Sequence, residues 1–577
     1  MVWKYKGRAV PLMLVLLFTA LGAAGQTPRP TIFFTDLLNG PNTGGENNNG
    51  TILTIYGKNF GTTQGSGTVT VGGGKVAQYY QWGVAAPGEL GLQKIAVGLG
   101  PSAATGQVVV TTSAGASACG NPSENCQFTV RAGNIYCVST SGSDSNTGKF
   151  PSSCWATIPK GAATIAAGDI VYIENGVVQS ATENYNGMVW IGGDGSGAAG
   201  SPKAIVGYPG AVASVGLCTS ADDIFGFRGS NYFKADDYWT IANMKACSTG
   251  RAIGGSGINY WRIVGNDLSC PVGGGSQGCF EPDAANYWNV YGNYVHDTGT
   301  NTKFYHGVYF STDDNHIDLG WNTVARITGC RGIQFYSSPV SYTSGYNQFD
   351  IQVHDNIVHD VRCDGINLST IDPSQGPVKV FNNLVYRAGT GPVPSDGGGN
   401  YACIYFADGS NNGAPGSGTS QVYNNTLYDC GANGGAGGVG ANQLGAINKG
   451  GSTTQFLNLT NNLVQVLPGE LYVSSSGGSG VSQMSGSNNL WFGNGSGPSA
   501  TSSNVNADPL FVSISSHDFH VQTSSPAIGA GTNSQASAFD LGGLFRPNPP
   551  SIGAYEFAAG VAPVKPNPPT NLSVIVK

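Results

Sequence analysis

Three ionisable side chains of different chemical type, His306, Arg331 and Asp364, each stand directly before a glycine in a recurring short segment. The segments read HGVYFS, RGIQFY and DGINLS, and the copies before and after them place Gln277 and Ala402 at the same position. Because the segments share one register, we expect these side chains to lie side by side on neighbouring repeats. A base, a cation and a carboxyl group in one strip can bind a substrate carboxylate and move protons beside it.

Two residues after each glycine stands a side chain that we expect to face outward. Aromatic rings and amides in such a column suit a sugar-binding cleft, because rings cover pyranose faces and amides bind hydroxyl groups. A polar, solvated sheet face is the alternative interpretation. The residues expected to line the cleft are Phe280, Tyr309, Gln334, Asn367 and Tyr405 in this column, Tyr336 two positions further on, and Tyr305, Asp313 and Asp314 at the ends of one segment.

Elimination at a uronic acid is one reaction that this strip could support. It needs a group that neutralises the carboxylate, a base that removes the C5 proton and an acid at the leaving oxygen. Arg331 is the predicted neutralising group, with His306 or Lys303 as the base. Tyr309 is the predicted acid, and Asp364 would orient His306 or Arg331.

Hydrolysis by paired carboxylates is the second candidate reaction, with Asp364 acting alongside Asp313 or Asp314 and with Glu281 as a further carboxylate. A third candidate is a non-catalytic surface protein that holds glycan on the same strip. The mixture of base, cation and phenol around a single central carboxylate favours the elimination. The acidic turn that contains Asp313, Asp314 and Asp318 also offers oxygen ligands for Ca²⁺.

A recurring asparagine reveals the elements that must position this strip. Its clearest copies lie in YGNYVHD, GWNTVAR, HDNIVHD, FNNLVYR and YNNTLYD, and a period of about 27 residues is typical of a repeat architecture. Apolar residues alternate before the asparagine and resume after it, which predicts two strands joined by a bend. We expect the asparagine to take left-handed backbone angles in that bend and to bond to its copies on adjacent coils. Weaker copies are expected at Asn243, Asn266, Asn462 and Asn489.

With the glycine segment as a third strand, each repeat makes one coil of an all-β fold, a parallel β-helix that is right-handed by the usual crossover rule. One column of this helix alternates in charge, which predicts a structural ladder of ion pairs instead of a catalytic site. We expect His296 and His359, one position earlier, to be exposed. The column consists of Asp297, Arg326, Asp360, Arg387 and Asp429.

Composition and charge limit the other possibilities. The net charge is −7 and no basic stripe is visible, which argues against nucleic-acid binding. Residues 1–26 combine basic residues, an apolar run and small residues, as a secretory signal peptide does. No other segment is long and apolar enough to span a membrane. We therefore expect a secreted, monomeric protein.

The twelve cysteines agree with export, because an even number in an oxidising compartment favours pairing. Cys330 and Cys363 hold the same register position on neighbouring coils, so we predict a disulfide between them. Local spacing predicts two further pairs, Cys119 with Cys126 and Cys137 with Cys154. For four of the other cysteines, Cys218, Cys247, Cys270 and Cys279, the sequence leaves the pairing ambiguous.

Residues 27–132 alternate short strands with turn signals, which predicts a small β-sandwich. The segments TIYGKNFG and VVVTTSAG, followed by FTV, resemble the immunoglobulin-like IPT/TIG domains. In bacterial secreted proteins such domains look like spacers or binding modules.

Residues 133–560 are predicted to form the β-helix domain. Their beginning, with IYCVSTSGSDSNTG, the helical WATIPKGAATIAAGD and the strand IVYIENG, resembles the N-terminal cap of the secreted pectate-lyase-like β-helix proteins, which include polysaccharide lyases and glycoside hydrolases. The segments NADPLF, SSPAIGAG and PPSIGAYEF resemble their closing region. The resemblance implies a polysaccharide as the partner. Residues 561–577 form a Pro-rich tail.

Overall fold

The structure is a computed structural model, and it describes residues 28–218, 225–231, 236–272, 277–338, 346–397, 399–407, 415–431, 444–475 and 480–557. The expected signal peptide and the Pro-rich tail lie outside these residues. The described chain is almost entirely β. Its helices are α1 (Ile158–Thr164) and the short 3-10 turns η1 (Glu46–Asn48), η4 (Val481–Gln483), η5 (Ile514–Ser516) and η6 (Asn533–Gln535).

The N-terminal part is a β-sandwich of two sheets, as predicted. The first sheet has the order β10 (Ala118–Cys119), β1 (Thr31–Thr35), β3 (Ile52–Lys58), β7 (Gln93–Gly98) and β6 (Gln78–Ala85). The second has the order β2 (Asn39–Gly40), β11 (Gln127–Val130), β8 (Gly106–Thr112), β4 (Thr68–Val71) and β5 (Gly74–Lys75), with β9 (Gly115–Ala116) paired to β8.

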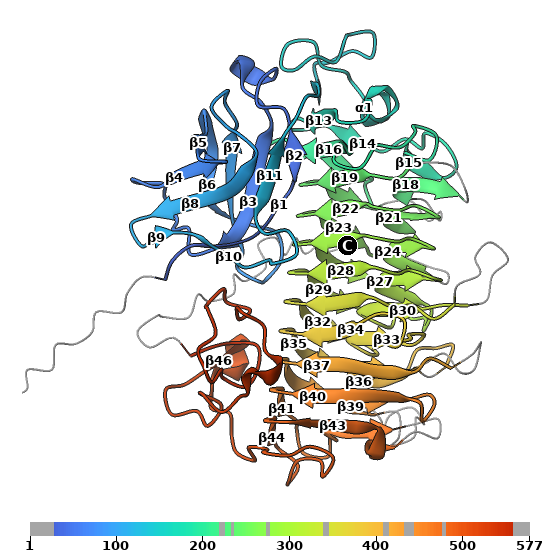
Figure 1. Ribbon diagram of the computed structural model, residues 1–577. Helices are drawn as coiled ribbons and strands as arrows, with labels where there is room; N and C mark the ends of the chain where they lie inside the picture. The colour runs from blue at the N-terminus through green and yellow to red at the C-terminus, as the bar shows by residue number, and fades with distance from the viewer. Residues whose placement is uncertain are drawn as a thin grey trace, which may run out of the picture.

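Beyond the sandwich, the chain winds into a right-handed parallel β-helix in which each full coil adds one strand to each of three parallel sheets (Figure 1). Sheet I consists of β12 (Ile135–Val138), β13 (Ile170–Ile173), β16 (Lys203–Gly207), β19 (Trp239–Ala242), β22 (Arg262–Val264), β25 (Asn289–Tyr291), β28 (Ile317–Gly320), β31 (Ile351–His354), β34 (Val378–Phe381), β37 (Gly418–Tyr423), β40 (Gln455–Thr460) and β43 (Met484–Ser487). Sheet II consists of β14 (Val178–Gln179), β17 (Ser214–Val215), β20 (Lys245–Cys247), β23 (Asp267–Cys270), β26 (Tyr294–Thr298), β29 (Thr323–Ile327), β32 (Ile357–Val361), β35 (Leu384–Ala388), β38 (Thr426–Cys430), β41 (Leu463–Gln465) and β44 (Leu490–Phe492). Sheet III consists of β15 (Gly187–Trp190), β18 (Phe225–Asn231), β21 (Arg251–Ser256), β24 (Gln277–Asp283), β27 (Tyr305–Ser311), β30 (Ile333–Tyr336), β33 (Ile366–Leu368), β36 (Tyr401–Phe406), β39 (Leu444–Lys449) and β42 (Val473–Ser475).

The asparagine ladder lies at the bend between sheets I and II. The Nδ2 of Asn293 donates to the Oδ1 of Asn322 at 3.0 Å, and Asn322 donates to Asn356 in the same way at 3.0 Å. These amides are almost fully buried, so the ladder satisfies polar groups that would otherwise be costly inside the stack. The stacking prediction is therefore confirmed.

Two details of the ladder differ from the prediction. The left-handed residue is the one before each ladder asparagine, for example Trp321 with φ 56°. Asn243 occupies this left-handed position instead of the ladder, and Met244 takes its place by donating its backbone N–H to Asn266 Oδ1 at 3.0 Å. The side chain of Asn243 turns outward instead and donates to Asp36 of the sandwich at 2.9 Å.

Stacked apolar side chains fill the inside of the coils. Trp261 and Trp288 stack with ring centroids 5.2 Å apart, and Phe310 and Phe335 stack at 4.6 Å. At the N-terminal end, the predicted helix is α1, which contacts β12, β13 and β15. The Thr157 hydroxyl accepts from Lys160 N at 3.3 Å and caps it.

All twelve cysteines are paired. The predicted disulfides Cys330–Cys363, Cys119–Cys126 and Cys137–Cys154 are present. The remaining pairs are Cys218–Cys247, Cys270–Cys279 and Cys403–Cys430.

The C-terminal segment does not simply close the last coil. Residues 502 and 505 extend the stack by bridging to Ser487 and Leu490. The chain then returns along the side of the helix, with the hairpin of β45 (Phe511–Ser513) and β46 (Asp518–Val521). Arg546 donates to Asn382 Oδ1 at 2.6 Å, so this segment braces coils well before the end of the stack (Figure 1).

The sandwich packs against sheet I and reaches the edge of sheet II. Phe34 lies 5.5 Å from the rings of both Tyr291 and Trp321. Glu89 extends to sheet II, where its carboxylate lies 3.0 Å from His359 Nε2. His359 is therefore buried, and the expectation of an exposed side chain was wrong.

The alternating column on sheet II does form ion pairs. Arg326 Nε lies 2.6 Å from Asp297 Oδ1, and Arg387 Nε donates to Asp360 at 2.7 Å. His296 is also bound, because its two ring nitrogens lie 2.7 Å from Asp267 and Asp297. The predicted ion pairs are therefore present at Arg326 and Arg387.

His354, at the end of β31, leads to a prediction about stability and pH. Burial disfavours its charged form, but Asp318 and Asp355, at 2.7 and 2.8 Å, outweigh burial and raise the pKa of His354 to about 9. A folded-state pKa above the unfolded value stabilises the fold fully at pH below about 6.5, and the stabilisation is lost as the pH rises through about 9. We expect a loss of up to about 3 kcal/mol over this window, measured by urea unfolding. An equally steep loss in His354→Gln would contradict this assignment.

Candidate active site

The structure brings the three predicted ionisable residues together. In sheet III, Val308 of β27 pairs with Ile333 of β30, and Ile333 pairs with Ile366 of β33. This register aligns His306, Arg331 and Asp364 on consecutive coils. Arg331 Nε lies 3.4 Å from Asp364 Oδ2, and Arg331 N donates to His306 Nδ1 at 3.4 Å.

His306 is 3% exposed and neutral. Burial and the neighbouring Arg331 guanidinium hold the pKa of His306 well below its ordinary value. Its Nε2 makes no hydrogen bond with the described residues, yet it is not shut off from solvent. The Arg331 N–H favours the tautomer with the proton on Nε2. Moving that proton to Nδ1 would break the hydrogen bond from the Arg331 N–H, at a cost of about 1–3 kcal/mol. Nε2 would then be free to act as a base.

Arg331 is held from one side and open on the other. Its Nη1 donates to the Lys303 carbonyl at 3.3 Å and to Gln334 Oε1 at 3.5 Å. Its Nη2 makes no hydrogen bond with the described part of the chain and is not sealed from solvent. One edge of the guanidinium is therefore available to an anion.

Asp364, on the next coil, forms an ion pair with Arg331. Burial raises its pKa to about 6, although Arg331 and Asn367 favour the charged form. Asn367 Nδ2 donates to Asp364 Oδ2 at 2.7 Å and is itself fully buried. Asn367 was predicted to bind substrate, but it positions Asp364 instead. Gln334 is also buried, against Arg331, so it too supports the cation and does not line an open cleft.

The register between β24 and β27 differs by one residue from the predicted one, which changes the N-terminal end of the outward-facing column. Gln277 pairs with Tyr305, and Phe280 pairs with Val308, which is one residue away from the predicted register. Phe280 therefore points into the core, and Glu281 stands outside, next to Tyr309 in the register. Neither Gln277 nor Phe280 belongs to the predicted columns.

Glu281, predicted from the sequence only as a further carboxylate, belongs to the site. Burial raises its pKa to about 7, although its ion pair with Arg251 on the previous coil favours the charged form. Asp283 follows two residues later, where its carboxylate accepts from Ser256 Oγ at 3.1 Å. Alternation along β24 places Glu281 and Asp283 on one face.

Tyr309 is a neighbour of His306 on the same strand and of Glu281 on the preceding coil. Its ring meets that of His306 edge to face, with centroids 5.1 Å apart. Burial raises the pKa of Tyr309, and Glu281 and Tyr336 raise it further, so the phenol keeps its proton. Tyr309, Tyr336 and Tyr405 are partly exposed and remain candidates for substrate contact.

Two of the three residues predicted to bind substrate at the strand ends are fully buried. Tyr305 is fully buried, and its hydroxyl donates to the Gly250 carbonyl. Asp314 is also fully buried. It accepts the Ala285 N–H at 2.6 Å, and burial holds its pKa well above the ordinary value. Asp313 accepts from Asn315 Nδ2 at 3.0 Å within the bend.

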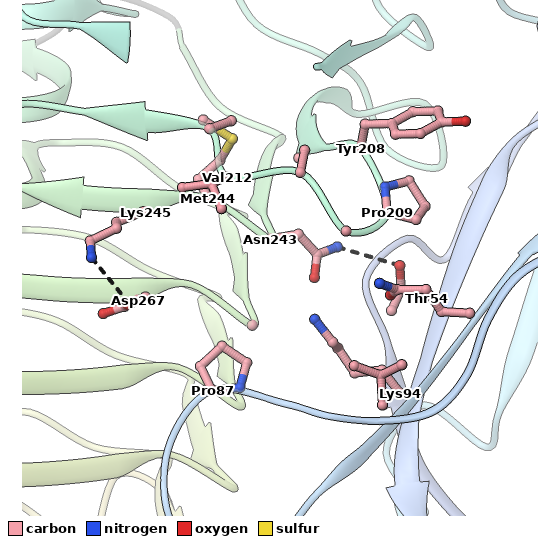
Figure 2. A pocket seen from close by; sticks show the side chains of 17 residues that line it. Thr54, Pro87, Lys94, Tyr208, Pro209, Val212, Asn243, Met244, Lys245 and Asp267 are labelled. Carbon is pink, nitrogen blue, oxygen red and sulfur yellow. Dashed lines mark hydrogen bonds and ion pairs between the residues drawn. The ribbon is translucent and has the colours of Figure 1, made fainter. Parts of the chain in front are cut away.

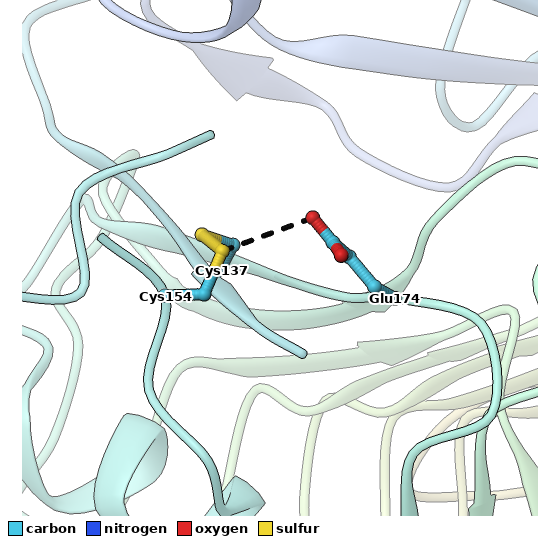
Figure 3. Close-up of side chains that lie close together, drawn as sticks. All are labelled: Cys137, Cys154 and Glu174. Carbon is cyan, nitrogen blue, oxygen red and sulfur yellow. Dashed lines mark hydrogen bonds between the residues drawn. A yellow bond between two sulfur atoms is a disulfide. The ribbon is translucent and has the colours of Figure 1, made fainter. Parts of the chain in front are cut away.

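The aspartates of the acidic turn that could bind calcium do not all converge. Asp318 binds His354 and the Tyr291 hydroxyl on sheet I, while Asp314 holds the bend after β27. Among the described residues, the one group of three ligand-type side chains within reach of a single ion is Cys137, Cys154 and Glu174 (Figure 3). Its two cysteines are joined in a disulfide, so they offer no thiolate to a metal.

Residues 389–397 and 399–401 lie at the edge of the site. Ser395 Oγ donates to the Asn301 carbonyl at 2.8 Å, and Asp396 accepts from Lys303 N at 2.9 Å. A Cβ at Gly399 would lie 3.3 Å from the sulfur of Cys330, so the segment passes closely over the Cys330–Cys363 disulfide. Lys303, the alternative base, is partly buried beneath it, with its Nζ 4.8 Å from the Phe304 ring centre.

Comparisons with known proteins give matches in shape. No protein-family model and no curated protein matches the chain. The solved pectate lyase Pel9A is 14% identical, with 73% of this chain and 96% of that chain covered and a TM-score of 0.46. A rhamnogalacturonan lyase is 14% identical, with 66% of this chain and 90% of that chain covered and a TM-score of 0.36. A family 28 exopolygalacturonase of Yersinia enterocolitica is 11% identical, with 83% of this chain and 99% of that chain covered and a TM-score of 0.37. The chemistry of this chain has to be inferred from its own residues.

Proposed function

We propose that the protein cleaves an acidic polysaccharide by β-elimination on the outer face of sheet III. The observation that carries the proposal is a neutral histidine, an anchored guanidinium and a protonated phenol on adjacent coils, with His306 Nε2 and Arg331 Nη2 both open to a ligand.

Each residue has one task in this reaction. Arg331 Nη2 pairs with the substrate carboxylate and so makes the C5 proton more acidic. His306 Nε2 takes that proton, and the electron pair left on C5 forms the C4–C5 double bond as the C4–O4 bond breaks. Tyr309 gives its proton to the leaving oxygen. The products are an unsaturated uronate and a new chain end.

Hydrolysis remains the second candidate because of Glu281 and Asp283. A carboxyl group with a pKa of about 7 can serve as a general acid, and a second carboxylate two residues along the same strand face could act as its partner. In this reaction Tyr309 and Arg331 would bind the sugar without transferring a proton.

We propose that this activity takes place outside the cell. The six disulfides fit an oxidising compartment. The sandwich, which resembles IPT/TIG domains, would hold the catalytic coils as a rigid support. Among the described residues, no helix has the length and hydrophobicity needed to cross a membrane.

A substrate panel tests the reaction. We expect the wild-type protein to release products with ultraviolet absorbance from pectin, alginate or a glycosaminoglycan, and to leave neutral glucans and xylans intact. Reducing ends without absorbance would establish hydrolysis, and binding without either product would establish a glycan-binding protein. Both outcomes contradict the elimination.

A further inference from the structure

A cavity of about 410 Å³ lies between the sandwich and the β-helix, away from sheet III (Figure 2). The sandwich contributes Gln81, Pro87 and Lys94 to its wall, and the β-helix contributes Lys245 and the turn at 207–213. Its volume is in the range of small-molecule sites.

Two lysines, Lys94 and Lys245, bring positive charge to the cavity, and nearby carboxylates compensate this charge only in part. The side chain of Lys94 projects into it (Figure 2), and its ammonium group makes no hydrogen bond or ion pair with any described residue. The nearby Asp36 already accepts the N–H groups of Leu37 and Thr54, both at 2.8 Å, and Nδ2 of Asn243 at 2.9 Å. Asp36 therefore attracts Lys94 electrostatically, but its hydrogen bonds go to other donors.

The second cation of the cavity is only loosely paired. Lys245 Nζ lies 3.9 Å from Asp267, which is held more closely by His296 at 2.7 Å. Because the whole chain has a net charge of −7, two weakly compensated lysines around one cavity mark a local preference for an anion.

The other groups in the wall suit a sugar. Gln81 forms no side-chain hydrogen bond with the described residues, so its amide is free for a hydroxyl group. Val84, Pro87 and Val212 add apolar surface that can cover a pyranose face. An ammonium group, a free amide and an apolar wall together match a sugar that bears a carboxylate.

We propose that this cavity binds a uronic acid unit, as a second carbohydrate site separate from the face of sheet III. Its carboxylate pairs with Lys94, and its hydroxyls meet Gln81. The ligand contacts both the sandwich and the β-helix. The inference rests on the cavity alone and holds whichever reaction sheet III performs.

Lysine acylation footprinting of the full-length protein tests the site. Burial lowers the pKa of Lys94, so a larger share of this amine is uncharged and reactive near neutral pH. We expect trimers of galacturonate, mannuronate or glucuronate to slow acetylation of Lys94 at least about fivefold at saturation, as read by peptide mass spectrometry. The exposed Lys75 on β5 is the matched control, whose labelling should not change.

Two further arms of the experiment distinguish uronate binding in this cavity from binding on sheet III and from unspecific anion binding. Protection should persist in Arg331→Ala, which impairs the site on sheet III, and should be absent with methyl-esterified trimers. The proposal is overturned if none of the trimers protects Lys94. It is also overturned if the ester or inorganic phosphate protects equally, or if protection disappears in Arg331→Ala.

Discussion

Replacing His306 with Ala is expected to lower kcat on an acidic polysaccharide by at least about a hundredfold, the usual scale for loss of a general base. The rest of the site should stay in place, because His306 accepts only one long backbone contact. The low pKa of His306 adds a second expectation. The wild-type base should remain unprotonated, and therefore active, well below pH 6.5.

Arg387→Ala is the matched control for this experiment. Arg387 is also a polar side chain of the β-helix, but it lies on sheet II, where it pairs with Asp360. Its loss should reduce stability and leave kcat almost unchanged. A larger loss of kcat in Arg387→Ala, or in Lys303→Ala, than in His306→Ala would show that His306 is not the base.

Replacing Arg262 with Ala is expected to destabilise the protein by about 3–5 kcal/mol, because it would leave a buried carboxylate without its partner. The side chains of Arg262 and Glu124 are each 7% exposed, and Arg262 Nη2 lies 3.1 Å from Glu124 Oε2. Arg262 Nε also donates to the Asp36 carbonyl of the sandwich at 3.2 Å. Urea unfolding at constant pH measures this loss.

Arg326→Ala provides the comparison for Arg262. Arg326 also pairs with a carboxylate, Asp297, but both side chains are partly exposed, so its loss should cost no more than about 1 kcal/mol. Equal costs for the two substitutions would mean that the ion pair between sandwich and β-helix is solvated in solution.

The fold could be predicted because each coil carries the same short sequence pattern. Each coil needs an asparagine at one bend and a small residue at another, and these requirements recur in register. The same register predicted the Cys330–Cys363 disulfide and the alignment of His306, Arg331 and Asp364.

The errors arose where tertiary contacts decide the outcome. Tyr305 and His359 occupy strand positions that the sequence pattern predicts to be exposed, but both are buried. Tyr305 bonds to the Gly250 carbonyl, and His359 pairs with Glu89 of the sandwich. The register of β24 differs by one residue from the prediction, so Glu281 takes the outward position that was assigned to Phe280. No single sequence motif marks this shift. The cavity around Lys94 joins two parts of the chain whose packing the repeat does not specify.

Mass spectrometry of the products formed in heavy-oxygen water is the most direct test of the proposed reaction. The substrate is the acidic polymer that responds best in the panel, and the enzymes compared are the wild type and His306→Ala. Elimination predicts an unsaturated chain end with no heavy oxygen in the wild-type products, and almost no product from the variant. Saturated products that have gained one heavy oxygen would contradict elimination and identify the protein as a hydrolase.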